Sequence, residues 1–214
     1  MIQQMYHYLR RLTFGVVCFL MWAGFSAGAD GTRNQTPDQA VKTFLKTVSS
    51  MEFPAIDPVR HVELVRQAHA YLDLETMGSQ ALADHWAGVS TEERQVFFDL
   101  LWKLVETVAY PKNRNLIGNE KIIYGETVQA GDGFQVPVNV QTEDEAPAVS
   151  MSYHLSEKEG RWKIDDMVLD DVSIIEDLKY QFDKIIAESE FPGLLESMRR
   201  RLAESKVKTK NEKV

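Results

Sequence analysis

The chain has 214 residues, with 24 Lys and Arg against 32 Asp and Glu and a formal net charge of −8 at pH 7. This acidic balance argues against nucleic-acid binding and against electrostatic adhesion to an anionic bilayer. Cys18 is the single cysteine, so stability must rest on packing and not on disulfides within the chain.

The first 29 residues have the organisation of a secretory signal peptide. Arg10 and Arg11 precede an apolar run over residues 12–25, and Ala27-Gly28-Ala29 has the small-x-small form of a cleavage site. An uncleaved anchor is the alternative, but the run is too short to span a bilayer and no basic cluster follows it. We predict a signal peptide at 1–29, a single domain at 30–204 and a charged flexible tail at 205–214.

Four helix starts follow, each marked by a capping residue or a proline: Thr36-Pro37 with Gln39, Asp57-Pro58, Asp73, and Ser90 with Glu93. The second helix has a predicted apolar face formed by Val59, Val62, Val65 and Ala68. In the fourth helix, apolar positions up to Val108 cover an arc of roughly 200°, about twice that of a surface helix. This helix is either a central core helix, or it packs on protein with one side and lines a cavity with the other. Tyr110-Pro111 is expected to end it.

Residues 120–169 predict four strands joined by short polar turns, hence an antiparallel meander with one buried face. Pro137 cannot donate to a ladder, so its strand is expected to lie at an edge or to be bulged there. In the last strand, Trp162, Ile164 and Val168 alternate with polar residues. Helices, then a meander, then helices again indicate an α+β domain.

The last strand runs without a loop into a helix that must fold back over the sheet. Ser173 and Glu176 form a capping box, and Ile174, Leu178 and Phe182 recur at helical spacing. Phe191-Pro192-Gly193 breaks this helix, and a final helix follows it.

This stretch resembles the C-terminal signature of periplasmic phospholipid carriers of the Mla and toluene-tolerance type. The matching positions are Trp162, Ile164 and Asp166, then Val172-Ser173-Ile174-Ile175, then Gln181-Phe182. Where that family usually has Glu-Gly, this chain has Asp170-Asp171. The resemblance covers most of residues 57–203 and extends upstream through Leu74-Glu75-Thr76-Met77-Gly78, His85-Trp86 and Ser90-Thr91-Glu92-Glu93-Arg94.

The resemblance implies a strongly curved four-stranded sheet, similar to the cone of nuclear-transport-factor-like folds. About six helices would wrap it, with an apolar slot between sheet and helices. It also implies a soluble carrier in a Gram-negative periplasm, without a cofactor or an ATP site. Such a carrier would shuttle phospholipid between an outer-membrane lipoprotein and porin complex and the MCE-domain subunit of an inner-membrane ABC transporter. A hopanoid-associated branch of the same family, with a polycyclic cargo, is the nearest alternative.

A slot for acyl chains needs aliphatic and flexible walls. The residues predicted to line it are Met77, Ala81, Phe97, Leu101, Leu104, Val108, Val136, Val138, Met151, Tyr153, Ile164, Val168, Ile174 and Leu178. Ordinary core packing is the alternative for all of them. Met167 is a further methionine placed to contribute.

Asp166 would face inward by strict alternation, whereas a bulge at Asp165-Asp166 would turn it outward. Facing inward, it could accept from backbone donors at the Ser173 helix start, or act as a general acid with His154 or Tyr153 in a cone-fold enzyme. No metal-ligand spacing is present, and we expect neither catalysis nor a metal site. An adaptor that only bridges envelope proteins is a third class. Arg199-Arg200-Arg201 could meet a lipid headgroup or form a solvated face.

Overall fold

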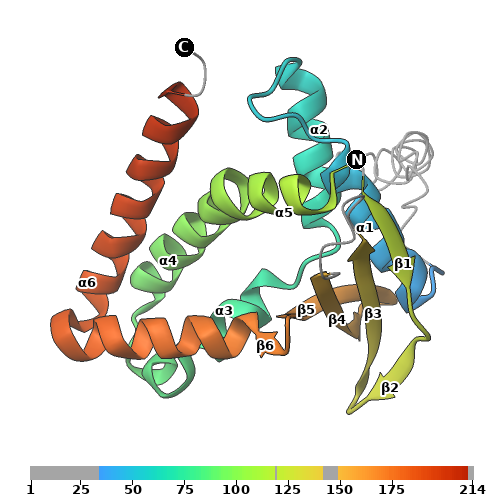
Figure 1. Ribbon diagram of the computed structural model, residues 1–214. Helices are drawn as coiled ribbons and strands as arrows, with labels where there is room; N and C mark the ends of the chain where they lie inside the picture. The colour runs from blue at the N-terminus through green and yellow to red at the C-terminus, as the bar shows by residue number, and fades with distance from the viewer. Residues whose placement is uncertain (1–33, 119, 142–148, 212–214) are drawn as a thin grey trace, which may run out of the picture. The chain divides into compact units, whose positions relative to one another are not determined.

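The computed structural model describes residues 34–118, 120–141 and 149–211, without the side chains of 206–211. The predicted signal peptide lies outside the described residues. The helical elements are α1 (Pro37–Ser49), α2 (Pro58–His69), α3 (Leu74–Leu82), the 3-10 helix η1 (Ala83–Gly88), α4 (Thr91–Leu104), the π-helix η2 (Val105–Ala109), α5 (Tyr110–Ile117) and α6 (Ile174–Asn211). The strands are β1 (Lys121–Tyr124), β2 (Val128–Ala130), β3 (Gly133–Gln141), β4 (Val149–Lys158), β5 (Arg161–Leu169) and β6 (Val172–Ser173). The predicted α+β class with an antiparallel sheet is confirmed (Figure 1).

The sheet has the order β1-β3-β4-β5-β6, and β2 also pairs with β3. One predicted strand appears as β1 and β2, because the chain leaves the ladder opposite Pro137. The backbone carbonyl of Pro137 accepts from the Gly125 amide at 2.9 Å. The nitrogen of an extended residue faces the same side as its carbonyl, so the missing N–H of Pro137 points at this break. The interruption therefore accommodates a proline in the interior of the sheet.

A β-bulge at Asp165 changes which residues of β5 face the helices. Asp166 lies opposite His154, but Ile164 lies opposite Leu155, so Asp165 is the extra residue. One extra residue exchanges the two faces of a strand beyond it. Met167 therefore pairs with Tyr153 on the inner face, and Val168 pairs with Ser152 on the outer face. The prediction that Val168 shares a face with Trp162 and Ile164 is wrong for this reason.

The fourth predicted helix does not end at Tyr110-Pro111. It continues from α4 through the π-helix η2 into α5, where Pro111 lies in the first turn. A proline inside a regular α-helix loses a hydrogen bond and collides with the carbonyl four residues earlier. The π turn immediately before it changes that bonding pattern, so the helix passes through Pro111 without stopping.

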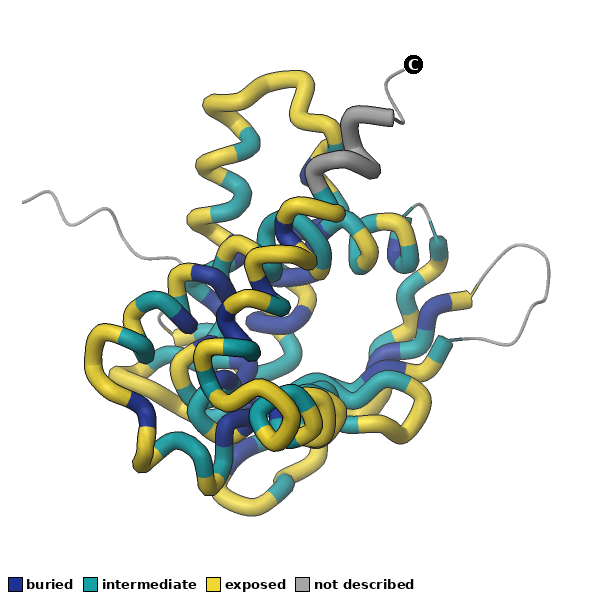
Figure 2. Tube along the Cα trace, turned by 90° about the vertical axis from the view of Figure 1, so that its left-hand side faces the viewer, coloured by how far each residue is buried: buried dark blue, intermediate teal, exposed yellow. Residues whose placement is uncertain are grey.

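Helix α2 forms where predicted, but its apolar face is mostly uncovered. Val59 and Val62 are 81% and 67% exposed, while Ala68 at the other end is fully buried. Figure 2 shows the exposed colour along this projecting helix. A periodic stripe predicts which side of a helix is apolar, but the length of the covering element decides how many turns are buried.

Helix α6 changes direction at Glu190, whose backbone has φ 55°, and Pro192 follows two residues later. At this kink the chain passes so close to itself that a Cβ on Gly193 would lie 2.3 Å from the Ser189 Cβ. The sequence predicts this break one to three residues further on. The second half continues as helix to Asn211, through residues 205–211 of the stretch predicted as a flexible tail at 205–214.

The buried apolar residues form two separate clusters. The sheet-side core joins α1 to β3 and β4 and includes Phe44, Val138 and Tyr153. The helix-side core joins α3, α4 and α6 and includes Phe97 and Leu194. A domain of this size usually has one contiguous core. The division into two leaves a space between sheet and helices that the protein itself does not fill.

Candidate functional site

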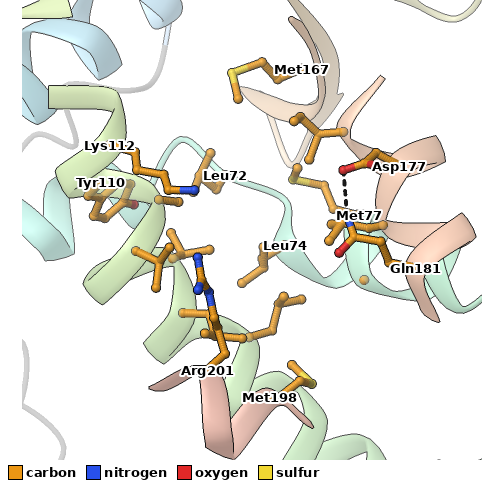
Figure 3. A pocket seen from close by; sticks show the side chains of 18 of the residues that line it. Leu72, Leu74, Met77, Tyr110, Lys112, Met167, Asp177, Gln181, Met198 and Arg201 are labelled. Atoms are coloured by element: carbon orange, nitrogen blue, oxygen red, sulfur yellow. Dashed lines mark hydrogen bonds between the residues drawn. The ribbon is translucent and has the colours of Figure 1, made fainter. Parts of the chain in front are cut away.

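A cavity of about 500 Å³ lies between the two cores and is partly open to solvent. This volume is within the range of small-molecule pockets, ~300–1,000 Å³. The sheet-side core contributes Phe44, Tyr153 and Ile164 to its wall, and the helix-side core contributes Leu74 and Leu101. Figure 3 shows side chains from opposite elements pointing into this space. The predicted slot between sheet and helices is therefore present.

The bulge in β5 shapes the sheet side of the cavity. Tyr153 and Met167 lie opposite each other in the β4–β5 ladder, and both reach the cavity. If β5 alternated strictly, without a bulge, Asp166 and Val168 would occupy the inner face in place of Met167. The bulge thus replaces a carboxylate by a flexible thioether in the wall.

The wide apolar arc of α4 is divided between protein and cavity. Phe97 is fully buried and makes an edge contact with the Phe182 ring at a centroid distance of 5.8 Å. Leu101, Leu104 and Val108 line the cavity. Of the two interpretations of this helix, the structure shows the one in which one side packs on protein and the other faces a cavity.

Helices α3 and α6 complete the wall. A Cβ on Gly78 would lie 2.8 Å from Phe98 and 3.0 Å from Leu101, so glycine allows α3 to approach α4 closely. Both halves of α6 contribute, with Ile174 and Leu178 before the Glu190 kink and Met198 after it. The kink is what brings one helix past the cavity twice.

Eight of the fourteen predicted site residues line the cavity: Met77, Leu101, Leu104, Val108, Tyr153, Ile164, Ile174 and Leu178. The other six do not. Ala81 and Phe97 lie within the helix-side core, Val136, Val138 and Met151 lie within the sheet-side core, and Val168 faces away from the cavity. Alternation identifies the inner face of a strand, but not whether a neighbouring helix already covers a given position.

Several lining residues were not predicted. Leu72 and Leu74 flank the Asp73 cap, and an isolated bridge between Leu72 and Ile164 brings this segment to the sheet. Lys112 and Arg201 also line the cavity. The triple-arginine run was a sequence signal for Arg201, but nothing in the local pattern distinguishes Lys112 from other exposed lysines.

Charge is confined to the rim of the cavity. Among the described lining residues, the charged ones are Lys112, Asp177 and Arg201, and all three are exposed. The phenols of Tyr110 and Tyr153 belong to the wall, and burial raises the pKa of both well above the ordinary value of 10. Both phenols are therefore neutral at physiological pH, and the interior of the wall carries no charge.

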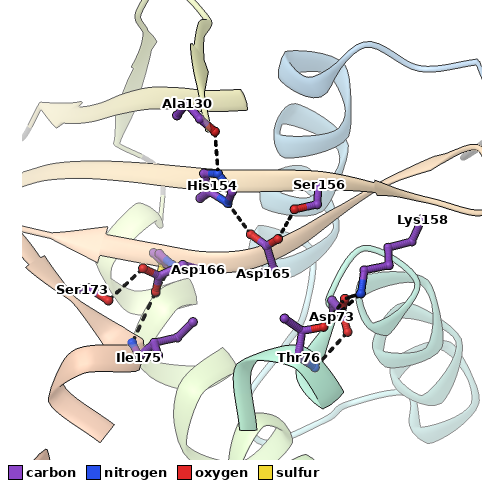
Figure 4. Close-up of polar contacts among 11 residues, drawn as sticks. Asp73, Thr76, Ala130, His154, Ser156, Lys158, Asp165, Asp166, Ser173 and Ile175 are labelled. Atoms are coloured by element: carbon purple, nitrogen blue, oxygen red, sulfur yellow. Dashed lines mark hydrogen bonds and ion pairs between the residues drawn. The ribbon is translucent and has the colours of Figure 1, made fainter. Parts of the chain in front are cut away.

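The carboxylates of the bulge lie on the other face of the sheet (Figure 4). Asp165 Oδ1 is 2.5 Å from His154 Nδ1, and Asp165 Oδ2 accepts a hydrogen bond from the Ser156 hydroxyl. His154 Nε2 is 3.1 Å from the Ala130 carbonyl oxygen. Burial alone would lower the pKa of His154, but the hydrogen bonds to Asp165 and Ala130 outweigh it and raise that pKa. This cluster ties β2, β4 and β5 together.

Asp166 faces outward, as the bulge alternative predicts. It nevertheless accepts hydrogen bonds at the Ser173 helix start, the structural role that was predicted for an inward-facing Asp166. Its Oδ2 accepts from the Ser173 hydroxyl at 2.8 Å, and its Oδ1 accepts from the backbone amides of Met167 at 2.8 Å and Ile175 at 3.3 Å. It therefore fixes the start of α6. Neither Asp166 nor His154 lines the cavity.

Within the ranges given above, no group of three His, Cys, Asp or Glu side chains is placed to hold a metal ion. Over the same residues, no helix is both long enough and apolar enough to cross a membrane.

Comparison with known proteins finds a matching family profile, a curated relative and a similar solved structure. The profile of a family described as MlaC protein matches residues 38–200. A curated relative is the intermembrane phospholipid transport system binding protein MlaC from Haemophilus influenzae, which is 32% identical over 111 residues. The matched segment covers 50% of this chain and 51% of the relative, so the chain spans about half of that relative's length. A solved structure of a phospholipid-binding protein from Ralstonia solanacearum, in complex with a phospholipid, superposes with a TM-score of 0.67 at 21% identity, over 80% of this chain and 99% of that one.

Proposed function

The chain belongs to the MlaC family, and from this membership and the cavity between its two cores we propose that it is a phospholipid-binding transport protein. The single observation that carries the proposal is the uncharged apolar wall, built from both cores and left unfilled by the protein's own side chains. The fold shared with the lipid-bound Ralstonia solanacearum protein supports it.

The energetics of acyl-chain burial suit such a wall. Each methylene removed from water contributes about 0.8 kcal/mol, so two acyl chains supply a large free energy without specific contacts. Met77 and Met167 add flexible side chains that can adapt to chains of different shape. An apolar wall therefore favours lipids as a class and leaves discrimination among them to the rim.

Two other classes of function are less well supported. The cone-fold enzyme would use Asp166 with His154 or Tyr153. Tyr153 lines the cavity with a neutral phenol, but Asp166, the general acid of that mechanism, and His154 lie on the far face of the sheet. An adaptor that only bridges other proteins would need no cavity. In this protein a cavity separates the two cores of the domain. Binding without catalysis is therefore the function that we propose.

We further propose that the protein acts in the periplasm and exchanges lipid with an outer-membrane complex and an MCE-domain ABC transporter. The signal-peptide pattern of residues 1–29 and the family membership support this place. N-terminal sequencing of the periplasmic fraction should find a chain that begins at Asp30. A full-length product in the membrane fraction would contradict it.

The direct test is to identify what the protein carries. Protein purified from cells without detergent should release phospholipid on extraction with organic solvent, detected by mass spectrometry at a fixed ratio to protein. A polycyclic lipid in its place would indicate the hopanoid alternative. Protein that carries no lipid, and whose melting temperature does not change after delipidation, would contradict a carrier function.

A further inference from the structure

The rim of the cavity brings together two cations that are far apart in the sequence. Lys112 lies on α5 and Arg201 on the second half of α6, yet both line the same cavity. In Figure 3 Lys112 reaches the cavity from the upper left and Arg201 from below, and the charged ends of both side chains lie in the same part of the view. This is an acidic protein, with 32 Asp and Glu against 24 Lys and Arg, so a rim with more cations than anions runs against its overall charge.

We propose that Lys112 and Arg201 together hold the phosphate of the bound lipid at the rim, with the acyl chains extending into the cavity. This inference rests on the proposed function and names the chemistry of the headgroup that the site selects. An arginine guanidinium presents a planar fork of donors to phosphate oxygens, and a lysine adds a mobile point charge. Phosphate-binding sites in proteins frequently combine these two side chains.

The existing contacts of these side chains leave both available to a ligand. Within the described part of the chain, Lys112 has no ion pair or side-chain hydrogen bond. Among the described residues, Arg201 makes one ion pair, 3.5 Å to Glu204 one turn along its own helix, and both of those side chains are more than half exposed. An exposed pair of this kind is worth little and is readily exchanged for a phosphate.

The neighbouring arginines of the run differ from Arg201. Arg199 lies 3.8 Å from Glu196, and Arg200 donates to the Ser197 hydroxyl at 3.3 Å. Neither lines the cavity. Of the two sequence interpretations of the triple-arginine run, the headgroup role thus applies to Arg201 alone, and Arg199 and Arg200 belong to the solvated face.

The anionic rim residue supports one orientation of the lipid. Asp177 accepts a hydrogen bond from Gln181 at 2.8 Å, and Figure 3 shows this pair across the cavity from Lys112. A carboxylate repels a phosphate, so it favours placement of the headgroup on the side of Lys112 and Arg201. The chains then lie between Met77 on the helix side and Tyr153 on the sheet side.

The test compares a double variant with a control of equal charge. Lys112→Ala with Arg201→Ala removes both cations from the rim, whereas Lys103→Ala with Arg199→Ala removes two exposed cations that do not line the cavity. Delipidated wild type and both variants are titrated with acyl-labelled fluorescent phosphatidylglycerol and with diacylglycerol that has the same two chains. Binding is measured at low and at high salt.

Loss of the phosphate contact should weaken phosphatidylglycerol binding by the rim variant about threefold to tenfold, the range expected for exposed ion pairs. Diacylglycerol binding should not change, and the control should match wild type for both lipids. High salt should reduce the difference, because it screens exposed charges. A melting curve at the wild-type temperature shows that the variant is folded. If it melts lower, Lys112→Glu with Arg201→Gln, compared at equal folded fraction, should weaken phosphatidylglycerol binding further.

Three outcomes would overturn the proposal. An equal loss of phosphatidylglycerol affinity in the rim variant and in the control would show that the effect comes from net charge and not from Lys112 and Arg201. An unchanged affinity for phosphatidylglycerol in the rim variant would show that the headgroup makes no contact there, while the carrier function still stands. Tight binding of glycerol 3-phosphate, which has no chains, would assign the cations to a soluble phosphate. Failure of wild type to bind either lipid would instead contradict the proposed function itself.

Discussion

The Ser173 hydroxyl donates a 2.8 Å hydrogen bond to the Asp166 carboxylate, and so joins the end of the β5 bulge to the first turn of α6. The same Ser173 oxygen accepts from the Glu176 amide at 3.2 Å, as the capping box predicts. The position of α6 over the cavity therefore depends on a carboxylate that itself lies on the opposite face of the sheet.

Replacement of Asp166 should affect stability and not lipid binding. Asp166→Ala leaves the Ser173 hydroxyl and the Ile175 amide without their acceptor and should cost about 1–2 kcal/mol of unfolding free energy. Asp166→Asn keeps one acceptor oxygen and should cost less. Both measurements come from denaturant unfolding, with co-purified lipid quantified in parallel. Loss of lipid from a variant that remains folded would show that Asp166 has a role in binding.

Leu104 and Val138 should respond in opposite ways to a larger side chain. Leu104 lines the cavity, so Leu104→Trp can occupy space that otherwise holds an acyl chain. Its delipidated form should keep the melting temperature of delipidated wild type, and it should leave cells with less lipid. Val138 is fully buried in the sheet-side core, so Val138→Trp should cost ~1–3 kcal/mol or more by overpacking. If both variants unfold alike, the cavity is ordinary core.

The loaded protein should melt at a higher temperature than the delipidated protein, because a ligand bound only by the folded state stabilises it. Leu104→Trp should show a smaller difference between the two forms. An equal difference in wild type and Leu104→Trp would mean that the lipid lies elsewhere.

Asp171→Gly should stabilise the turn between β5 and β6. Asp170 and Asp171 form this two-residue turn, with φ of 47° and 67°. Relief of a left-handed penalty of ~1–2 kcal/mol, less the greater chain entropy of glycine, predicts a gain of roughly 0.5–1 kcal/mol. Asp170→Gly is the matched control. It relieves the same strain but loses the contact of Asp170 Oδ1 with the Ser150 amide at 3.3 Å, and should gain less.

His154 should make stability fall as the pH rises above neutral. Its pKa in the folded protein is raised above the ordinary 6.5, so the folded state binds the proton more tightly than the unfolded state does. This stabilisation is fully present below pH 6.5 and is lost as the pH passes through the folded pKa. The difference in unfolding free energy between wild type and His154→Gln should therefore be largest near about pH 6 and decrease towards about pH 9.

His69 has the opposite effect on the pH dependence of stability, but it does not affect the comparison of wild type with His154→Gln. Burial lowers its pKa to about 4, so it disfavours the folded state as the pH falls below 6.5. This contribution is the same in wild type and in His154→Gln, and it cancels in the difference. A difference that does not depend on pH would show that His154 does not hold its proton more tightly in the folded protein.

Much of the fold follows from local features of the sequence. Gln39 accepts from the Thr36 amide at 3.1 Å, and Glu93 accepts from the Ser90 amide at 3.0 Å, at the helix starts where capping boxes are predicted. These bonds join residues three positions apart, so they form wherever the motif occurs. The alternation in β3 and β4 similarly places Val136, Val138, Met151 and Tyr153 on the buried face. The family resemblance could be found from the sequence because it depends only on the order of such local features.

The cavity wall was decided by long-range pairing. The register of β4 against β5 creates the bulge that brings Met167 inward and moves Val168 outward, and no window of β5 alone contains that register. Likewise, Val138 and Tyr153 share a buried face, but only Tyr153 lies where the two cores separate. Lys112 and Arg201 line the same cavity because α6 bends at Glu190 and its second half packs against α4. Caps and alternation act within one turn or one strand, whereas a cavity depends on which elements fail to touch, and that is set only when all of them have packed.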